Sequence, residues 1–273
     1  MTPLAKGVLL AVVAVLATGA AAPRTLRVCA DPNNMPFSDA RRRGFENRLA
    51  ALVARDLGAR LEFTWWAQRR GFVRNTLGAA RCDLIPGVPT DFEPVATTAP
   101  YYRSSYVFVT RADAPPIASL AEPRLRQLRI GVHAVGDDYA SVPPAVALAR
   151  LGIVDNVRGY LLQGDYREPD PPARLLEAVL KGEIDVAIAW GPLAGYAALR
   201  QRAQLRVTPV REDGATAGVP LSFAIAMGVR KDDTALRREV DRVLVRRRAE
   251  IQRVLVSYGV PLLAMEEGSH AIR

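Results

Sequence analysis

Hydrophobic and polar positions in the first third of the chain follow two alternating periods. Short apolar runs with strand spacing lie at 26–30, 61–65 and 84–85, and the segments 44–58 and 68–77 between them carry apolar side chains at helical spacing. Strands that alternate with helices through short links are typical of a doubly wound parallel sheet. The pattern therefore predicts an α/β unit in this part of the chain.

A proline-punctuated segment follows the third predicted strand. Pro86 and Gly87 form a turn signal, which we expect to end the strand at 84–85. The aromatic-rich residues 101–106 are predicted to form a turn. Residues 106–110 are rich in β-branched and aromatic side chains, so they are predicted to form a strand that leads out of the first unit.

The same alternation begins again after a connector at 111–127 that is rich in Pro, Ala and charge. The predicted elements of this second unit are strands at 128–132, 159–162 and 184–190 and helices at 145–151 and 171–181. Residues 205–209 are predicted to form a second strand between the units, and 221–229 a strand that returns to the first unit. One long helix is predicted at 233–258, with an apolar face and an arginine-rich face that we expect in solvent rather than in a docking surface.

Residues 1–22 have the features of a secretory signal. Lys6 precedes an apolar run at 8–16, and three alanines at 20–22 precede Pro23. The apolar run is shorter than a membrane span requires, and no cysteine lies at the cleavage site. We therefore expect export to the periplasm, cleavage between Ala20 and Pro23, and a mature chain without a membrane span or lipid anchor.

Composition is that of a globular protein, with 273 residues of which 49% are hydrophobic and 24% charged. Loss of Lys6 with the signal lowers the net charge from +9 to +8. A basic surface favours acidic partners. No helix-turn-helix, zinc or RNA-binding motif accompanies this charge, so a nucleic-acid partner is not expected.

Cys29 and Cys82 are the only cysteines. Export would place them in an oxidising compartment, where a disulfide is favoured. Against the bond, Cys29 falls near the end of its predicted strand whereas Cys82 precedes its own, and adjacent parallel strands can then hold the two too far apart. We expect the disulfide, with two free thiols as the alternative.

Catalytic motifs are absent from the sequence. His133 and His270 are far apart and lack partners at metal-ligand spacings. No glycine-rich phosphate loop precedes a helix, and serines such as Ser104 have no evident base partner. We therefore expect no metal, no cofactor and no catalysis.

Several residues are candidates for binding a ligand or partner. Loops at the carboxyl ends of parallel strands face the ligand crevice of an open sheet, and Arg103 can bind a carboxylate through two parallel hydrogen bonds or instead pair with a nearby acid to steady its turn. Aromatic anchors and basic side chains can hold a protein segment. The candidates are Asp31, Asn33, Asn34, Phe37, Trp66, Gln68, Arg69, Arg70, Pro89, Tyr101, Tyr102, Arg103, Asp137 and Trp190.

Five motifs together resemble one subgroup of the type II periplasmic binding proteins, the quinoprotein dehydrogenase-associated substrate-binding-like proteins of the MoxJ/XoxJ type. They are LRVCADPNNMPFS, GFENRLAALVARDLG, WWAQRRGFVRNTL, RCDLIPGVP and TTAPYYRSSYVFV. The resemblance is strong from Leu26 to about Val109 and looser in the second unit. It implies an α/β fold of two lobes, each a mostly parallel sheet flanked by helices, joined by two hinge strands. The implied divisions are a signal peptide at 1–22, a first lobe at 23–110 and 209–273, and a second lobe at 111–208.

The resemblance also implies a function. Proteins of this subgroup are periplasmic partners of a PQQ-dependent alcohol or methanol dehydrogenase and assist its maturation or activation. The dehydrogenase is the expected partner, its cytochrome c is a second candidate, and a small ligand stays undetermined.

The chain departs from the amino-acid receptors of the wider fold at two places. Trp190, Gly191 and Pro192 stand where such receptors usually carry an acidic residue for a ligand ammonium. Asp137 and Asp138 stand near the helix start that usually favours a ligand carboxylate, which they would repel. The accessory function is therefore preferred. A solute receptor of an ABC transporter is the second alternative, and an enzyme on the same fold comes last.

Overall fold

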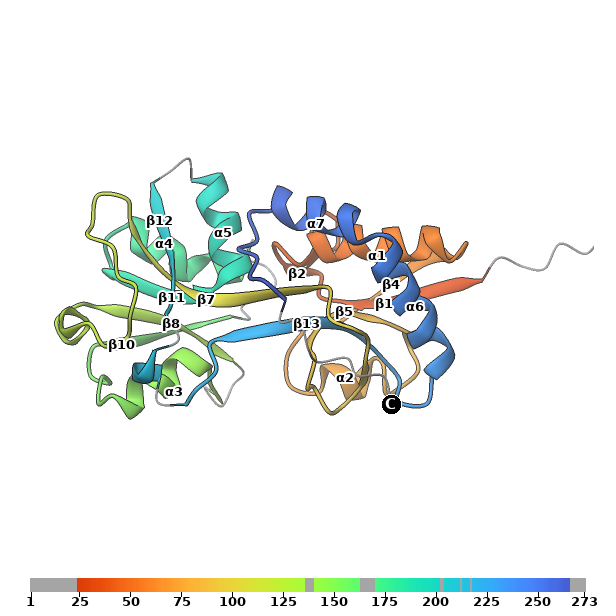
Figure 1. Ribbon diagram of the computed structural model, residues 1–273, viewed down its shortest axis with the longest axis horizontal. Coiled ribbons are helices and arrows are strands. Elements are labelled where there is room, and N and C mark those ends of the chain that lie inside the picture. The colour runs from red at the N-terminus through yellow and green to blue at the C-terminus, as the bar shows by residue number, and fades with distance from the viewer. Residues whose placement is uncertain are drawn as a thin grey trace, which may run out of the picture.

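The computed structural model describes residues 24–135, 140–162, 170–201, 204–211, 213–216 and 218–265. The signal segment, Asp137, Asp138 and His270 lie outside these ranges. The described chain forms an elongated α/β molecule of two lobes (Figure 1). Two long strands, β7 and β13, run between the lobes.

The first lobe is built on parallel pairing at the start of the chain. Strand β1 (Thr25–Ala30) pairs in parallel with β4 (Arg60–Trp65), and Val28 also bridges Leu84 in parallel. The other elements of this lobe are β2 (Asn33–Asn34), β3 (Ser38–Asp39), α1 (Phe45–Asp56), α2 (Phe72–Asn75), β5 (Ile85–Pro89), β6 (Ala96–Thr97), α6 (Thr234–Arg246) and α7 (Arg248–Ser257).

The second lobe repeats this arrangement. Strand β8 (Ile130–Val135) lies between two parallel neighbours, β10 (Val157–Leu161) and β11 (Val186–Trp190). The remaining elements are β9 (Ala140–Ser141), α3 (Pro143–Arg150), α4 (Arg174–Leu180), α5 (Gly191–Arg200) and the 3₁₀ turns Pro123–Arg126, Pro171–Ala173 and Gly214–Thr216.

Strand β7 (Tyr102–Arg111) belongs to the sheets of both lobes. Its first four residues pair antiparallel with β13 (Ser222–Val229), and the rest of the strand pairs with β11 on one side and β12 (Leu205–Pro209) on the other. Figure 1 shows β7 and β13 crossing from one lobe to the other. Because β7 continues from the sheet of one lobe into the sheet of the other, its pairing register fixes which of its residues face the strands of each lobe.

The core of the first lobe forms because α1 is apolar on one face. Phe45, Leu49 and Val53 are fully buried at helical spacing, and they pack with β1, β13, α6 and α7. Apolar side chains on both faces of the second sheet are buried in the same way. The strands of the second sheet are therefore nearly continuous apolar runs in the sequence, as is usual for parallel strands that are covered on both faces.

Three predicted elements differ from those observed. The helix predicted at 68–77 is a helix only at α2, because Gly71 adopts φ +85°, outside the helical region. The turn predicted at 101–106 is the start of strand β7, because Tyr102 to Ser105 pair with β13. The long helix predicted at 233–258 divides at Arg247, where φ is −102° and ψ is 11°, into α6 and α7.

The turn expected at Pro86 and Gly87 is also wrong. These residues lie inside β5, which pairs antiparallel with β13. Strand β5 is the last strand on its side of β13 in the sheet order. Sheets tolerate proline in such strands, because proline there removes no donor from an inner ladder.

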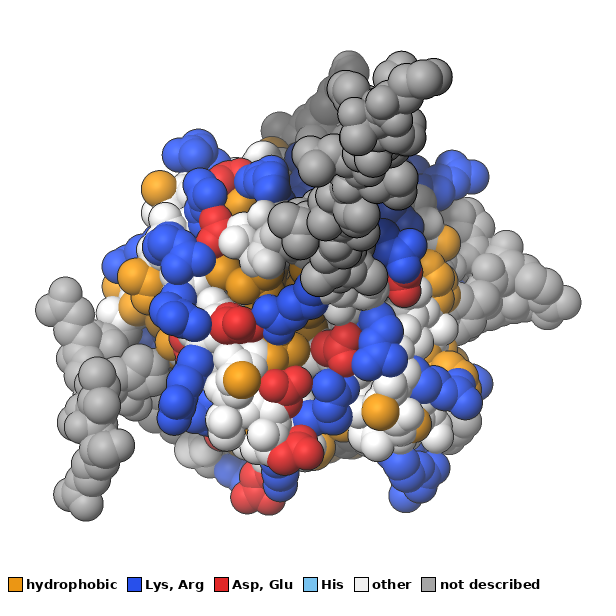
Figure 2. All heavy atoms as spheres, turned by 90° about the vertical axis from the view of Figure 1, so that its right-hand side faces the viewer, with side chains coloured by type: hydrophobic (Ala, Val, Ile, Leu, Met, Phe, Trp, Pro, Cys, Tyr) orange, Lys and Arg blue, Asp and Glu red, His pale blue; other side chains and the backbone are white. Residues whose placement is uncertain are grey.

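Both arginines at the helix division bind one acidic residue. The guanidiniums of Arg246 and Arg247 contact the carboxylate of Asp56 at the end of α1, at 2.6 Å for Arg247. In the end-on view of Figure 2, basic side chains are interspersed with acidic ones over this end of the molecule. Part of the arginine-rich face therefore holds α6 and α7 against α1, and the face is not an unbroken basic surface.

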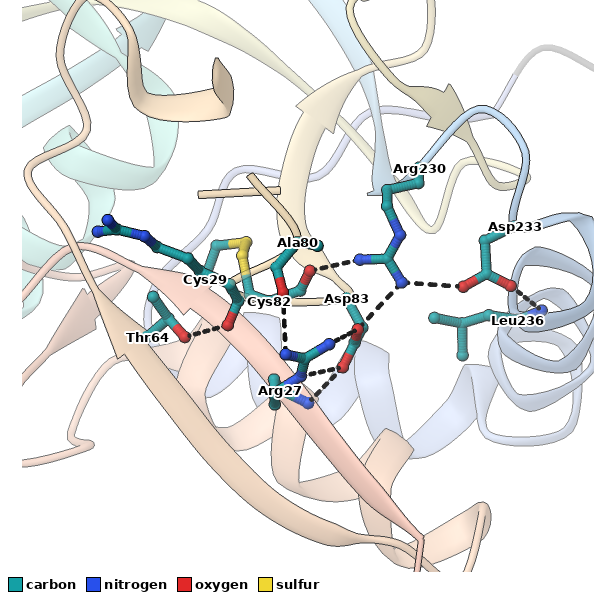
Figure 3. A network of polar contacts seen from close by, with 10 residues as sticks. Arg27, Cys29, Thr64, Ala80, Cys82, Asp83, Arg230, Asp233 and Leu236 are labelled. Carbon is teal, nitrogen blue, oxygen red and sulfur yellow. Dashed lines mark hydrogen bonds and ion pairs between the residues drawn. A yellow bond between two sulfur atoms is a disulfide. The ribbon is translucent and has the colours of Figure 1, made fainter. Parts of the chain in front are cut away.

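The structure joins Cys29 and Cys82 by a disulfide, with the two Cα atoms 5.5 Å apart. The geometric objection fails because Cys29 donates its backbone N–H to Leu84 O at 2.8 Å, which places the segment before β5 level with the end of β1. Figure 3 shows the disulfide beside a network of charged side chains formed by Arg27, Asp83 and Arg230.

Candidate functional site

A cavity of about 500 Å³ lies where the carboxyl ends of β1, β5, β8 and β11 meet the two crossing strands. In open α/β sheets, ligands bind in such a crevice outside the strand ends, and the volume is that of a small-molecule site. The lining is mostly apolar. It consists of Asp31, Asn33, Asn34, Phe37, Glu46, Gln68, Gly87, Val88, Pro89, Tyr102, Tyr106, His133, Val142, Pro143, Leu162, Pro171, Trp190, Leu193, Phe223 and Ile225.

The loop after β1 is organised by the carboxylate of Asp31. Its oxygens accept backbone N–H groups from Asn33 at 2.8 Å and Gln68 at 2.7 Å. Asn34 Nδ2 also donates to Gln68 Oε1 at 3.1 Å. The buried carboxylate therefore holds the loops after β1 and β4 together on one side of the cavity.

Three aromatic rings line another part of the cavity. Trp190 at the end of β11 lies 5.4 Å from Tyr106 of β7 and 6.0 Å from Phe223 of β13, measured between ring centroids and with tilted planes. Trp190 and Tyr106 are direct ladder partners. Edge-to-face pairs of this kind stabilise one another beyond the burial of their area, so the wall is a preformed apolar surface.

Glu46 is a buried acid at the edge of the cavity, in the first turn of α1. Its Oε1 lies so close to Gly87 that a Cβ at that position would be 2.2 Å away, and the absence of a side chain on Gly87 makes room for the carboxyl group. Burial, with a further contribution from the charge of Asp31, raises the pKa of Glu46 to about 8. The Glu46 carboxyl is therefore mainly neutral near pH 7.

His133 lies on β8 and is also buried. Its Nε2–H donates to the carbonyl oxygen of Pro172 at 3.3 Å. Burial lowers the pKa of His133 to about 4, against the opposing effect of that hydrogen bond. The imidazole is therefore neutral at physiological pH and adds no positive charge to the cavity.

Eight of the predicted site residues line this cavity. They are Asp31, Asn33, Asn34, Phe37, Gln68, Pro89, Tyr102 and Trp190. Asp137 lies outside the described residues. Arg69 and Arg70 are exposed on the loop after β4 and are not part of the lining.

Three predicted site residues lie elsewhere. Trp66 packs near the disulfide, with the guanidinium of Arg81 5.5 Å from its ring. The hydroxyl of Tyr101 is turned inward and donates to Pro86 O at 2.9 Å. Arg103 is in strand β7 rather than in a turn, and its Nη2 donates to Ser222 Oγ at 2.9 Å.

Glu46 was missed, although one signal was available. Glu46, Ala50 and Val53 lie at helical spacing on one face of α1, and all three are buried. An acidic residue in line with two apolar ones on the buried face of a helix indicates a functional or partnered group. Tyr106, His133 and Phe223 had no such signal, because an inward position on a sheet depends on register.

None of the described helices combines the length and apolar character that a membrane crossing requires. Within the described ranges, no three His, Cys, Asp or Glu side chains gather as a metal site would need.

Comparison with known proteins gives matches along most of the chain. Residues 26–258 match the model of the bacterial extracellular solute-binding proteins, family 3. Protein MoxJ of Methylorubrum extorquens is 36% identical over 252 residues, which are 88% of this chain and 82% of that protein.

Two crystal structures are similar over 88% of this chain and 100% of the solved chain. The periplasmic binding protein XoxJ from Methylobacterium extorquens AM1 gives a TM-score of 0.72 at 37% identity. MxaJ from Methlophaga aminisulfidivorans MPT gives a TM-score of 0.77 at 28% identity.

Proposed function

The chain belongs to the bacterial extracellular solute-binding proteins of family 3, and from that premise we propose that it is a periplasmic accessory protein of a PQQ-dependent alcohol or methanol dehydrogenase. In this proposal it binds the dehydrogenase and assists its maturation or activation, with the cytochrome c of the dehydrogenase as a second candidate partner. The type II periplasmic binding protein fold and the likeness to MoxJ/XoxJ-type proteins are confirmed.

The observation that carries the proposal is the similarity to MoxJ and XoxJ over nearly nine-tenths of the chain. It spans both lobes and the crossing strands, so it concerns the whole binding architecture. The names of these relatives associate them with methanol oxidation.

The cavity supports the proposal by its chemistry. Trp190 stands at the end of β11, where amino-acid receptors of this fold usually hold a ligand ammonium with an acid. Among the described lining residues there is no Lys or Arg to bind a ligand carboxylate. Rigid aromatic rings such as Trp190 and Phe223 are instead the side chains that most often anchor partners at interfaces.

A direct binding measurement tests the proposal. The dehydrogenase, in apo and PQQ-loaded forms, is immobilised and the mature chain is flowed over it across a salt series. We expect binding that weakens as salt rises, because salt screens the attraction between a chain of net charge +8 and the acidic partner that such a charge favours. No binding to either form, together with tight binding of a small solute from periplasmic extract, would assign the protein to transport instead.

Transport is the second candidate function, and the cavity favours it by size. A volume of about 500 Å³ lies within the range of small-ligand pockets, and closure of the two lobes about β7 and β13 would enclose a solute. In this alternative the chain delivers its ligand to an ABC transporter. Neighbouring genes for a permease and an ATPase, in place of a dehydrogenase and a cytochrome c, would favour it.

Export and the lobe boundaries belong to the same proposal. We propose cleavage of the signal between Ala20 and Pro23, a first lobe at 23–110 and 209–273, and a second lobe at 111–208. The intact mass of the periplasmic protein tests the cleavage, because a mature form that keeps Met1 contradicts it. Hydrogen exchange tests the boundaries, because backbone amides within one lobe should share a level of protection that differs from that of the other lobe.

A further inference from the structure

The carboxyl group of Glu46 is a buried acid with no hydrogen-bond donor among the described residues. The residue is 8% exposed, and its side chain lines the cavity while Oε1 lies against Gly87. Buried carboxyl groups are ordinarily hydrogen-bonded or paired with a cation. A carboxyl group that no described residue pairs, in the lining of a ligand-sized cavity, is therefore placed to bind a ligand.

The charges around the cavity point to the sign of that ligand. Asp31 contributes a second carboxylate to the same cavity and raises the pKa of Glu46 through its charge. The described lining contains no Lys or Arg, and His133 is neutral because its pKa is about 4. Among the described lining residues, no basic side chain therefore offsets the two acidic groups.

The aromatic wall suits the same ligand. The rings of Tyr106, Trp190 and Phe223 contact one another and line the cavity. The faces of such rings attract cations, and cages of aromatic rings bind alkylated ammonium groups. The lining thus offers a cation with an apolar body both carboxyl groups and aromatic rings.

We propose that the cavity binds an organic cation, an ammonium or guanidinium group on an apolar body without a carboxylate, with its charged end against Glu46 and Asp31. The absence of a basic side chain from the described lining disfavours a free amino acid. The source is either a free organic cation or an Arg or Lys side chain of a protein partner. The proposal does not depend on the dehydrogenase, since the cavity chemistry alone carries it.

Binding of this ligand is coupled to a proton. Burial raises the pKa of Glu46 to about 8, so the empty protein holds its carboxyl mainly protonated at pH 7. The neighbouring hydroxyls of Tyr101 and Tyr102 have pKa values that burial raises well above the ordinary value, and they stay neutral. A bound cation stabilises the carboxylate, so the proton leaves Glu46 for solvent when the ligand binds.

Titration calorimetry on the mature chain tests this directly. The probe is butylguanidinium, which is charged at every pH used, and its neutral counterpart is butylurea. Repeating the titration in buffers of different ionisation enthalpy counts the protons released. With a pKa of about 8, we expect release of ~0.9 proton at pH 7 and ~0.1 at pH 9, and a Kd about tenfold tighter at pH 9.

Two variants separate the proposal from a merely apolar pocket. Glu46→Gln keeps the shape of the side chain and should abolish proton release and weaken butylguanidinium about tenfold at pH 9. Lys231→Ala, on the exposed turn before α6, should bind the probe as the unchanged chain does. Equal affinity for butylurea, or butylguanidinium binding without proton release in the unchanged chain, would overturn the proposal.

Further ligands in the same titration identify the source of the cation. Comparison with dehydrogenase binding distinguishes a failure of the cation site from a failure of the accessory function. Blocked arginine, with acetyl and amide ends, should exceed butylguanidinium in affinity if the source is a protein side chain, and should fall below it if the source is a free cation. Free arginine, with its carboxylate, should bind more weakly than either. Dehydrogenase binding without probe binding overturns the cation site alone, and the reverse result overturns the accessory function alone.

Discussion

Arg230 and Asp83 are 147 positions apart in the sequence, and the Arg230 Nη2 lies 3.0 Å from the Asp83 Oδ1. The same carboxylate accepts from Arg27 Nη2 at 2.6 Å, and Arg230 Nη1 donates to Cys82 O at 2.6 Å. Asp83 therefore ties β1, the segment before β5 and the residue that follows β13 together. Figure 3 shows the two guanidiniums converging on it.

Replacement of this acceptor should destabilise the first lobe. We expect Asp83→Asn to lower the free energy of unfolding by about 2 kcal/mol, because a hydrogen bond to a charged group contributes ~1.5–3 kcal/mol. Urea denaturation measures the loss. The matched control is Asp113→Asn, whose carboxylate is 85% exposed and 3.8 Å from Arg111. Exposed pairs contribute little, so an equal loss in both variants would show that Asp83 has no special role.

Loss of the disulfide should also lower stability. A cross-link between positions 53 apart restricts the unfolded chain, and removal of such a bond costs ~2–4 kcal/mol. We expect the double variant Cys29→Ala, Cys82→Ala to unfold at lower urea concentration. The unchanged chain in reducing agent should show the same shift, since both lose the same constraint. A shift in neither sample would mean that the thiols are not joined in the mature protein.

A side chain at Gly87 should displace the Glu46 carboxyl. Gly87→Ala is expected to cost ~1–3 kcal/mol, as overpacked sites do, because its Cβ would lie 2.2 Å from Glu46 Oε1. The cost should largely disappear when Glu46 is alanine, which a double-mutant cycle measures. Gly214→Ala serves as the control, since nothing lies within 4 Å of a Cβ there. Additive effects of the two changes would contradict the contact.

Stability should depend on pH through two buried groups with opposite signs. The pKa of Glu46 is about 8 in the folded protein, above its ordinary value of 4.5. The stability that this shift contributes is fully present below pH 4.5 and is lost as pH rises to 8. The folded pKa of His133, about 4, is below its ordinary 6.5, so stability falls as pH drops from 6.5 to 4. For each group, the free energy of unfolding should change by at most ~1.4 kcal/mol per pH unit.

Denaturation across pH, with Glu46→Gln and His133→Gln as variants, separates the two slopes. Glu46→Gln should gain stability relative to the unchanged chain between pH 5 and 8 and no further above it. His133→Gln should remove only the loss of stability between pH 6.5 and 4. Parallel curves for all three chains would show that neither group has the shifted pKa.

Association with the dehydrogenase should depend on charge near the cavity. Arg69 is exposed on the loop whose neighbour Gln68 lines the cavity. We expect Arg69→Glu to slow association in low salt and to do so less at 0.1 M, since the screening length falls from ~30 Å at 0.01 M to ~10 Å at 0.1 M. Lys231→Glu makes the same change of charge on the turn before α6. Equal slowing by both would indicate net charge rather than a local contact.

Periodicity and motifs in the sequence determined the family and most of the main strands and helices of both lobes, although α5 (Gly191–Arg200) was not predicted. Apolar spacing is a local property, so β1, α1 and β11 could be located without knowledge of the rest of the fold. The topology of a parallel sheet then placed the loop after β1, with Asp31 and Asn34, at the ligand crevice. These predictions needed only the order of residues along the chain and the general topology of parallel sheets.

Only the tertiary structure decided which side chains line the cavity. Glu46 meets Gly87 because α1 packs beside β5, and the rings of Tyr106, Trp190 and Phe223 meet because β7 pairs with β11 and β13 in one particular register. A shift of register by one residue would turn each of these side chains to the other face of the sheet. Strand β5 likewise continues through Pro86 because β13 supplies its partner. Contacts between distant segments depend on which elements pack together and in which register, and no local pattern in the sequence records that.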